Sequence, residues 1–244
     1  MMLVSIIIPV YNEQTTIGEV IDRVLEVDLG DIEKEIIVAD DGSTDRSPQV
    51  VAEKVRASDV IKVHTCPINM GKGAAIRFGM EYACGSIFII QDADLELDPT
   101  EYLRLLQPIL EGKTDVVYGS RFLENAKNIP LRTRLANQFL TLLTNALYGS
   151  RLTDMETAYK VFRSEVLGGI ALRSVGFDFE PEFTAKLLRG GRQIHEVPIS
   201  YKPRTESEGK KISLIDGVEA VYTLLKYRFF SRFMFQPRRP AWYR

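Results

Sequence analysis

Short apolar runs rich in β-branched residues recur along the first half of this sequence, and they constrain its fold more than any other feature. The runs are Val4–Val10, Glu35–Asp40, Val60–His64, Ser86–Asp92 and Asp115–Gly119. Each is short enough to be a strand buried on both faces. Because helical patterns fill the gaps, right-handed crossovers should join the strands. The sequence therefore predicts an α/β protein with a mostly parallel sheet flanked by helices.

The expected helices carry recognisable start signals. Thr16 and Glu19 have the spacing of a capping box ahead of an apolar helical pattern. Pro48 and Pro99 stand where the first turn of a helix tolerates proline. We therefore expect helices to begin close to these positions.

The alternation of strands and helices breaks down after Gly119. A long helix is expected near Leu131–Tyr148, followed by a Thr-rich turn, more helix and a late strand at Ile194–Tyr201. Glu and Lys alternate around a glycine in Arg204–Lys211, which predicts a mobile loop. With 244 residues and 45% hydrophobic content, the chain is expected to form one enlarged domain.

Charge is unevenly distributed along the chain. The formal net charge is −2, yet Lys226–Arg244 contains six basic residues and no acidic one. An acidic body argues against nucleic-acid binding, and the basic end favours an anionic surface as its partner. Leu135–Ser150, the longest uncharged stretch, is interrupted by polar residues, so no transmembrane helix is expected.

The cysteines and the N-terminus indicate a reducing compartment. Cys66 and Cys84 are too few for a disulfide framework, and no Cys/His cluster indicates zinc. Leu3–Ile8 is strand-like and lacks the basic region and cleavage site of a secretory signal. A cytoplasmic location is therefore expected.

Ligands of open α/β sheets bind outside the carboxyl ends of the strands, so residues just after each run are candidate site residues. Pro9–Glu13 follows the first run and Asp40–Asp45 follows the second. Each stretch by itself could be an ordinary turn with Asx or Ser capping. Together, at one edge of the sheet, they favour a nucleotide pocket.

The fourth run ends in carboxylates, at Asp92, Asp94 and Glu96. Their mutual repulsion is costly without a cation, and Mg²⁺ or Mn²⁺ suits oxygen ligands and can bridge carboxylates to a diphosphate. The alternative is an acidic cluster that complements the dipole of the following helix. Asp98 fits that alternative well, whereas Asp92 and Asp94 fit it poorly.

The motifs PVYNE, DDGSTD, NMGKGAAIR, DADLE and GSRF, in this order, resemble family-two inverting glycosyltransferases with a Rossmann-like GT-A fold. In the second half, RLAN, LTDMETAYKVFR, GFDFEPEF and EVPISYKPR look like the polyprenyl-phosphate branch, typified by dolichol-phosphate mannose synthases. The resemblance implies a nucleotide-sugar-binding half over residues 1–119 and an acceptor-side half over 120–211.

The resemblance also implies roles for individual residues. Those expected to contact the nucleotide sugar are Pro9, Tyr11, Glu13, Asp40, Asp41, Lys72, Asp92, Ala93 and Asp94. Asp94 is the favoured ligand of Mg²⁺ or Mn²⁺, with Asp92 and Glu96 as further carboxylates. The motif of dolichol-phosphate mannose synthases usually ends in Gln, so Glu96 is a departure that bears on donor or metal preference.

A phosphate acceptor is already an anionic nucleophile and needs no strong base, but it is repelled by the donor diphosphate. Arginines would offset this repulsion by bidentate contact. The candidates for the acceptor phosphate are Arg121, Arg132, Arg134, Arg204, Lys210 and Lys211. Arg121 and Arg134, with Asp94, are the expected catalytic residues, and Asp154 is the candidate acid or base, with a turn or cap role as its alternative.

Gly71-Lys72-Gly73 invites comparison with a phosphate-binding P-loop. A P-loop needs Ser or Thr after the lysine and a longer glycine spacing, so this interpretation is rejected. The resemblance instead places Lys72 before a helix that lines the donor side. The two glycines would permit a tight turn and close packing.

The C-terminal region 212–244 is expected to be an amphipathic helix with a basic, aromatic tail. Ile212–Phe230 has apolar residues at helical spacing, and Trp242 and Tyr243 follow near the end. Arginines mixed with aromatic residues suit the interface of an anionic membrane, on its cytoplasmic face. The alternative is a helix that packs on the core and ends in a basic tail.

The resemblance therefore leads us to expect inverting transfer of a hexose from a GDP- or UDP-sugar to a polyprenyl phosphate. One alternative keeps the fold and donor but uses the hydroxyl of a saccharide or small metabolite as acceptor. Another is a regulatory subunit that binds the nucleotide sugar without turnover. No nucleic-acid partner is expected, and the oligomeric state has no signal in the sequence.

Overall fold

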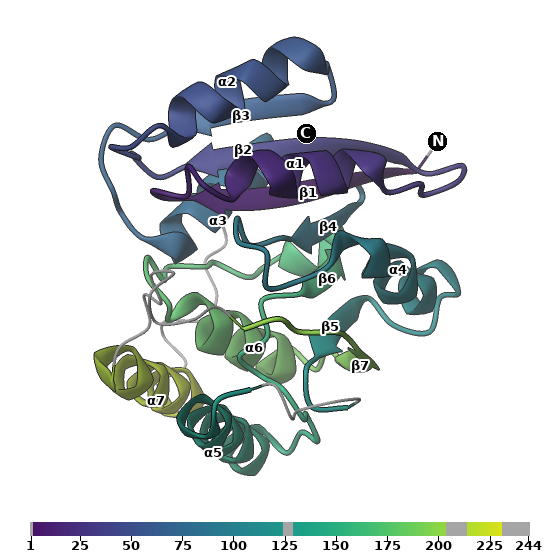
Figure 1. Cartoon of the computed structure of the whole chain (residues 1–244). Coiled ribbons are helices and arrows are strands. Elements are labelled where there is room, and N and C mark those ends of the chain that lie inside the picture. Colours follow the sequence, from purple (N-terminus) through teal and green to yellow (C-terminus); the bar gives the residue numbers. More distant parts are fainter. Residues whose placement is uncertain (1, 124–128, 204–213, 231–244) are drawn as a thin grey trace.

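A seven-stranded sheet forms the centre of the computed structural model, which describes residues 2–123, 129–203 and 214–230. The strand order is β3-β2-β1-β4-β6-β5-β7, and β6 alone runs antiparallel to its neighbours. The strands are β1 (Leu3–Val10), β2 (Glu33–Asp40), β3 (Ile61–Thr65), β4 (Ile87–Ile90), β5 (Val116–Ser120), β6 (Lys160–Arg163) and β7 (His195–Pro198). Figure 1 shows the sheet running from β3 to β7 through the middle of the molecule.

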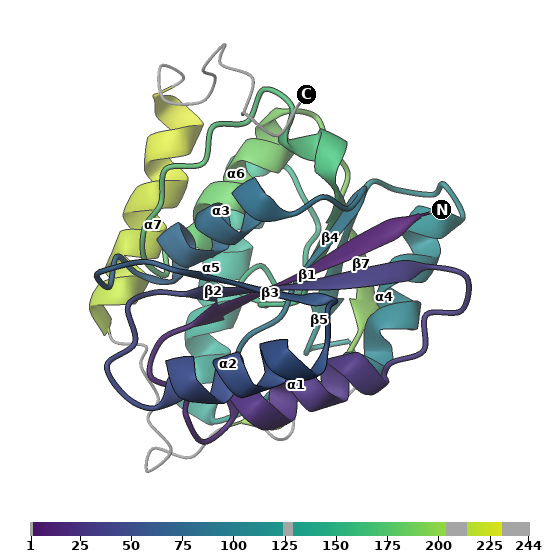
Figure 2. The ribbon, with the colours of Figure 1, turned by 90° about the horizontal axis from the view of Figure 1, so that it is seen from above.

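Helices cover both faces of the sheet, as expected for an α/β protein. They are α1 (Ile17–Glu26), α2 (Ser47–Ala57), α3 (Lys72–Tyr82), α4 (Tyr102–Leu110), α5 (Leu131–Tyr148), α6 (Phe179–Arg189) and α7 (Leu214–Phe229). Helices α1, α2 and α4 pack on one face, and α3 and α6 pack on the other. Figure 2 shows α1 and α2 on the opposite side of the strands from α3 and α6.

Successive side chains of β1 point to opposite faces of the sheet, so this strand contributes to two apolar clusters. Ile6 and Ile8 point to the cluster with α1 and α4, whereas Ile7 points to the cluster with α3 and α6. All three are fully buried, as the sequence predicted for strands covered on both faces. The parallel sheet and the apolar runs are thereby confirmed, with the ends of these five strands shifted by at most two residues.

Helices α5 and α7 form an outer layer against α6. Leu140 of α5, Ala185 of α6 and Leu224 of α7 belong to a third, smaller apolar cluster. This layer lies at the opposite end of the molecule from α2 and β3 (Figure 1). Both long helices were expected from the sequence, and α5 has the predicted bounds.

The start of α1 and strand β6 differ from what the sequence predicted. Thr16 precedes α1, but its side chain makes no capping bond, because its hydroxyl donates to the Glu13 carboxylate instead. The capping-box prediction was therefore wrong. Strand β6 was not predicted, since four residues between loops carry too short a pattern to distinguish from a turn. Pro48 and Pro99 do occupy the first turns expected of them.

The cysteines and the long helices can also be compared with the sequence predictions. Both cysteines are free thiols. Within residues 2–123, 129–203 and 214–230, no helix has the length and apolar character needed to cross a bilayer. The expected loop at Arg204–Lys211 and the tail with Trp242 and Tyr243 lie outside the described residues.

Candidate active site

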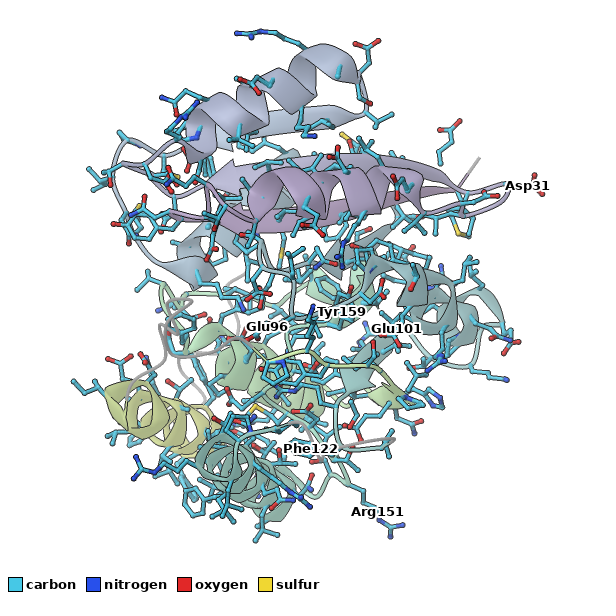
Figure 3. All side chains as sticks on the ribbon, viewed as in Figure 1. Asp31, Glu96, Glu101, Phe122, Arg151 and Tyr159 are labelled. Atoms are coloured by element: carbon cyan, nitrogen blue, oxygen red, sulfur yellow. The ribbon has the colours of Figure 1, made fainter. Side chains whose placement is uncertain are left out.

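The topology brings the candidate residues to one edge of the sheet. Strands β1, β2, β4 and β5 are parallel, so the residues that follow them gather at their carboxyl ends. Because β6 is antiparallel, the residues that precede it reach the same edge. The Gly119 amide donates to the Tyr159 carbonyl at 2.9 Å. Figure 3 labels Glu96 and Tyr159 in this central region.

The loops after β1 and β2 are tied together by Asn12. Its backbone has φ 53°, a left-handed conformation that asparagine tolerates. The Asn12 Oδ1 accepts the Thr44 amide at 2.8 Å, and the Asn12 amide donates to Ser43 Oγ at 3.0 Å. The Glu13 amide donates to Ser47 Oγ at 2.8 Å. These bonds fix the PVYNE and DDGSTD loops relative to each other.

Asp40 and Asp41 are both buried, but their surroundings differ. The Asp41 carboxylate accepts the amides of Met70 at 2.9 Å and Gly71 at 2.6 Å, which holds the segment before α3. Asp40 accepts the Ser43 amide with Oδ1, while its buried Oδ2 has no hydrogen-bond partner in the described chain. Asp40 is therefore the one with an oxygen available to a ligand.

The start of α3 is packed tightly against the segment before α6. Gly71 has φ 105°, and a Cβ there would lie 2.4 Å from the Val175 carbonyl oxygen. The amides of Gly73 and Ala74 donate to the carbonyls of Gly176 and Val175. The glycines of the GKG motif thus permit close backbone approach, as expected.

Lys72 is the first residue of α3 and lies between two carboxylates. Its Nζ is 2.8 Å from Asp92 Oδ1 and 3.1 Å from Glu180 Oε1. Burial favours the neutral amine, but Asp92 and Glu180 outweigh it and raise the pKa of Lys72. The lysine is therefore a fixed positive charge at the start of α3. Glu180 was not singled out in the sequence, although it lies in the GFDFEPEF motif.

The turn after β4 carries the DADLE motif on a fixed backbone. Gln91 is fully buried, and its side-chain oxygen accepts the hydroxyls of Tyr102 and Tyr159 at 2.7 Å each. The Asp94 carboxylate accepts the Glu96 amide, and Glu96 in turn accepts the Tyr201 hydroxyl at 3.0 Å. Asp98 caps the short helix Pro99–Glu101, so the capping alternative holds for Asp98.

The carboxylates of this turn can be tested for their fit to a divalent cation. Among the described residues, no three His, Cys, Asp or Glu side chains are gathered as a metal cage. Mg²⁺ commonly binds through one or two carboxylates together with substrate phosphates, and it keeps several waters. Lys72 already compensates Asp92, and Asp94 and Glu96 follow it in the same turn. The donor set fits a cation that a diphosphate helps to coordinate.

Arg121, directly after β5, is held by a buried carboxylate. Its Nε and one terminal nitrogen each lie 2.7 Å from the oxygens of Asp154, and its amide donates to the same carboxylate at 3.0 Å. Asp154 is fully buried. The guanidinium also lies over the Tyr201 ring, 5.3 Å from its centroid. Asp154 therefore orients Arg121, an arrangement that favours a positioning role over acid or base chemistry.

Arg121 and the donor-side carboxylates are linked by Tyr201. Its ring contacts Arg121, and its hydroxyl donates to Glu96. Burial, followed by the negative charge of Glu96, raises the pKa of Tyr201, while Arg121 opposes this shift. Tyr201 was named only as part of a motif, because nothing in its local sequence indicates these distant partners.

The remaining candidate residues lie in β1, in the core, in the first loop and at the start of α5. Pro9 lies within β1, Ala93 is buried in the core, and Tyr11 and Glu13 are half-buried in the first loop. Arg132 is exposed and Arg134 is half-buried, both in the first turn of α5. The acceptor candidates Arg204, Lys210 and Lys211 lie outside the described residues.

The open sheet, the nucleotide-type loops and the acidic turn together define a class of protein, the glycosyltransferases of GT-A fold. The glucosyl-3-phosphoglycerate synthase of Mycobacterium tuberculosis, solved with Mn²⁺, UDP and phosphoglyceric acid, shares this fold. The TM-score is 0.71 at 20% identity, over 93% of this chain and 79% of that one.

Within this class, the chain belongs to glycosyl transferase family 2, whose family description matches residues 5–170. It is 30% identical over 233 residues to the dolichol-phosphate mannosyltransferase of Pyrococcus furiosus, covering 93% of this chain and 64% of that protein. It is 29% identical over 242 residues to a dolichyl-phosphate beta-glucosyltransferase of Trichomonas vaginalis, covering 93% and 73%. The chain thus spans less than two thirds of the first of these relatives.

Proposed function

We propose that this protein transfers a hexose, mannose or glucose, from a GDP- or UDP-sugar to a polyprenyl phosphate, dolichyl or undecaprenyl, with inversion at the anomeric carbon. The observation that carries the proposal is the pairing of two charged centres at one sheet edge. Lys72 and the DADLE carboxylates form the first centre, on the donor side. Arg121, which is held by Asp154 and directly follows β5, forms the second. The names of the two curated relatives support the lipid phosphate acceptor.

On the donor side, the loops after β1 and β2 would receive the nucleoside. Asp40 offers an unpartnered carboxylate oxygen to the base or ribose. Lys72 would add a positive charge near the diphosphate, because its amine is held charged by Asp92 and Glu180. Asp41 supports this arrangement indirectly, since its carboxylate holds the backbone at Gly71.

Asp94 is the proposed main ligand of Mg²⁺ or Mn²⁺, with Glu96 and Asp92 close along the same turn. The cation would neutralise charge on the leaving nucleoside diphosphate. The M. tuberculosis synthase with Mn²⁺ and UDP supports a divalent cation of this kind.

On the acceptor side, Arg121 would bind the acceptor phosphate and offset its repulsion from the donor diphosphate. Its guanidinium is fixed by two bonds to Asp154, so little conformational freedom is lost on binding. Arg132 and Arg134 are further candidates at the start of α5. The phosphate oxygen would attack the anomeric carbon in line with the departing diphosphate, without a protein base.

Association with a membrane surface is part of the proposal. Leu131, Leu135, Phe139 and Leu142 are 57–69% exposed and recur at helical spacing along α5. Exposed Ile215, Val218, Tyr222 and Phe229 form a similar row along α7, which packs beside α5. We call these two rows the α5/α7 apolar face. Such a face suits an interfacial helix pair, and the basic residues from Lys226 onward would complement anionic lipids.

A second candidate acceptor is a small phosphorylated metabolite. It is favoured by the similarity of fold to the M. tuberculosis synthase, which was solved with phosphoglyceric acid. Arg121 would serve either acceptor, because both present a charged phosphate. The two candidates differ in whether the α5/α7 apolar face is needed for turnover.

The test is release of nucleoside diphosphate by the purified full chain with Mg²⁺ or Mn²⁺. A panel of GDP- and UDP-hexoses is offered with a polyprenyl phosphate, and separately with phosphoglyceric acid. We expect release with the polyprenyl phosphate, and Asp94→Asn should lower it by about a hundredfold or more. Asp31→Asn is the matched control, because Asp31 is exposed and far from the site in Figure 3.

Three results bear on the choice. Release with phosphoglyceric acid alone would favour the small-metabolite acceptor. No release with any donor, from a protein that binds nucleotide sugars, would favour a non-catalytic binding subunit. Equal activity of the Asp94 and Asp31 variants would contradict the role given to the DADLE motif.

A further inference from the structure

Two buried side-chain oxygens in the described part of the chain lack a hydrogen-bond partner, Asp40 Oδ2 and Glu156 Oε1. Leaving a buried polar atom unpaired costs about 1–3 kcal/mol, so such atoms in a folded protein call for an explanation. Both lie at the carboxyl edge of the sheet. Asp40 belongs to the proposed nucleoside pocket, whereas Glu156 has no role in the reaction described so far.

The backbone on both sides of Glu156 is firmly held. Asp154, two residues before it, is buried against Arg121. Thr157, the residue after it, donates its hydroxyl to the Gly119 carbonyl at the end of β5. Residues of β6 then begin at Lys160, whose amine donates to the carbonyls of Met155 and Thr157. Glu156 therefore occupies a defined place rather than a variable loop position.

Contacts of the residues beside Glu156 reach both halves of the site. Asp154 holds Arg121. The Lys160 amine, held by the carbonyls of Met155 and Thr157, lies over the Tyr118 ring, and the Tyr118 hydroxyl bonds Thr184, one turn after Glu180 on α6. Burial, followed by the negative charge of Glu180, raises the pKa of Glu156, while Lys160 and Arg121 oppose the shift. Glu180 is bonded to Lys72 on the donor side. Arg121 is the proposed ligand of the acceptor phosphate. The carboxyl of Glu156 is thus influenced by one charged centre from each side.

In an in-line transfer, the sugar must lie between the leaving diphosphate and the attacking phosphate. A residue whose chain neighbours contact both the Arg121–Asp154 pair and the start of α6, where Glu180 pairs with Lys72, is well placed to reach such a sugar. Carboxyl groups bind hydroxyls well, because each oxygen accepts hydrogen bonds and a protonated carboxyl also donates one. A partly exposed residue with one unpartnered buried oxygen matches this requirement.

We propose that Glu156 hydrogen-bonds hydroxyl groups of the transferred sugar and helps to decide which nucleotide sugar is accepted. This inference rests on the proposed function, because it presumes a nucleotide-sugar donor. It assigns Glu156 a contact with the sugar and none with the nucleoside diphosphate. A site that hydrogen-bonds a substrate hydroxyl discriminates strongly against analogues that lack it.

The experiment compares two ligands that differ only in the sugar. Binding of UDP and UDP-glucose, and of GDP and GDP-mannose, is measured by calorimetry on the full chain with Mn²⁺. For Glu156→Ala we expect nucleoside diphosphate affinity within about twofold of wild type, and affinity for the accepted nucleotide sugar weaker by about tenfold or more. Glu165→Ala is the control, because Glu165 is an exposed glutamate just beyond β6.

The thermal midpoint provides a second readout. Because Glu156 Oε1 is buried without a partner, removing the carboxyl should not lower the thermal midpoint. If Glu156 served stability alone, its removal would lower the midpoint. If Glu156→Ala does not fold, Glu156→Gln keeps the side-chain volume and removes the charge. A drop in selectivity across the sugar panel is expected for either variant.

The possible results separate the inference from the proposed function. Equal loss of affinity for UDP and UDP-glucose, or no loss for either, would overturn the role of Glu156 while wild type still binds nucleotide sugars. If wild type binds none of the four ligands, the proposed function fails and the inference fails with it. Loss confined to the sugar-bearing ligand supports the inference.

Discussion

At the scale of single residues, the clearest feature of the candidate site is the buried ion pair of Asp154 and Arg121. Asp154 is fully buried and holds Arg121, and the Glu196 carboxylate holds the amides of Thr153 and Asp154. The pair therefore sits on a preformed backbone. Under the proposed function, Asp154 would contribute to catalysis through the arginine that it orients, and its loss should also be visible in stability.

We expect Asp154→Asn to lower the free energy of unfolding by about 3–5 kcal/mol, because the guanidinium of Arg121 would stay buried without its counter-charge. Urea denaturation measures this change. Asp115→Asn is the matched control. Asp115 pairs with Arg163 and Arg192 at the surface, so its loss should cost under about 1 kcal/mol. Equal costs for the two variants would contradict the buried pairing.

The sequence predicted several residues of the candidate site but not how their side chains pair. The acidic doublet Asp92 and Asp94 was visible as a carboxylate cluster at the end of a strand. The sequence also indicated Arg121 and Asp154 as candidates, but the bidentate bond between them was not predicted. Glu156 and Glu180 lie in motifs that carry the resemblance but were not singled out, because neither carries a local signal beyond its charge.

At the scale of elements, the start of α3 is the most sensitive junction in the donor half. Its first residue is Lys72, and its backbone bonds to the carbonyls of Val175 and Gly176, which lie about a hundred residues later in the chain. The same segment is held by Glu182, which accepts the amides of Arg173 and Ser174. The position of Lys72 thus depends on how α3 and α6 dock.

We expect Gly71→Ala to reduce kcat/KM by about a hundredfold, because the new Cβ would push α3 away from the Val175 carbonyl and displace Lys72. Steady-state kinetics and the thermal midpoint are measured together. Gly149→Ala is the matched control, since Gly149 has φ 69° but no atom within 4 Å of the new Cβ. It should cost stability alone. Unchanged kinetics in Gly71→Ala would contradict this role of the junction.

Strand prediction worked at the element scale wherever the pattern was long enough. Leu3–Val10 and Glu33–Asp40 are strands of eight residues, buried except at their first one or two positions, and both were predicted nearly to their ends. The four residues of β6 were missed, yet this strand brings Asp154, Glu156 and Thr157 to the ligand edge. The expected capping box failed because the Thr16 hydroxyl found a nearer acceptor in Glu13.

At the scale of the whole molecule, the proposed function is divided between two ends. The nucleotide loops follow β1 and β2, while the α5/α7 apolar face lies on the far outer layer beyond α6 (Figure 1). The inner side of this layer packs on α6, and its outer side exposes leucine and phenylalanine. The inner side stabilises the fold, and the outer side is the surface that we propose meets a membrane.

We expect Leu135→Glu and Phe139→Glu to lower partition of the full chain onto anionic phospholipid vesicles by about tenfold, because each removes one large apolar contact with the bilayer. Vesicle sedimentation measures the partition. Leu103→Glu is the control, since Leu103 is a 48% exposed leucine on α4, away from the face. Equal partition of all variants would show that the α5/α7 apolar face does not bind lipid.

The sequence by itself determined the α/β architecture, the strands of the donor half and the acidic turn after β4. These features are local, since each depends on residue periodicity or on a motif within one short segment. Only the tertiary structure decided that Lys72 joins Asp92 to Glu180, that Asp154 holds Arg121, and that a buried oxygen of Glu156 is left without a partner. Those contacts join residues 20 to about 108 positions apart, and they arise from the antiparallel insertion of β6 and the docking of α3 on the segment before α6. Local patterns specify elements, whereas the partner of a buried charge depends on which elements the fold brings together.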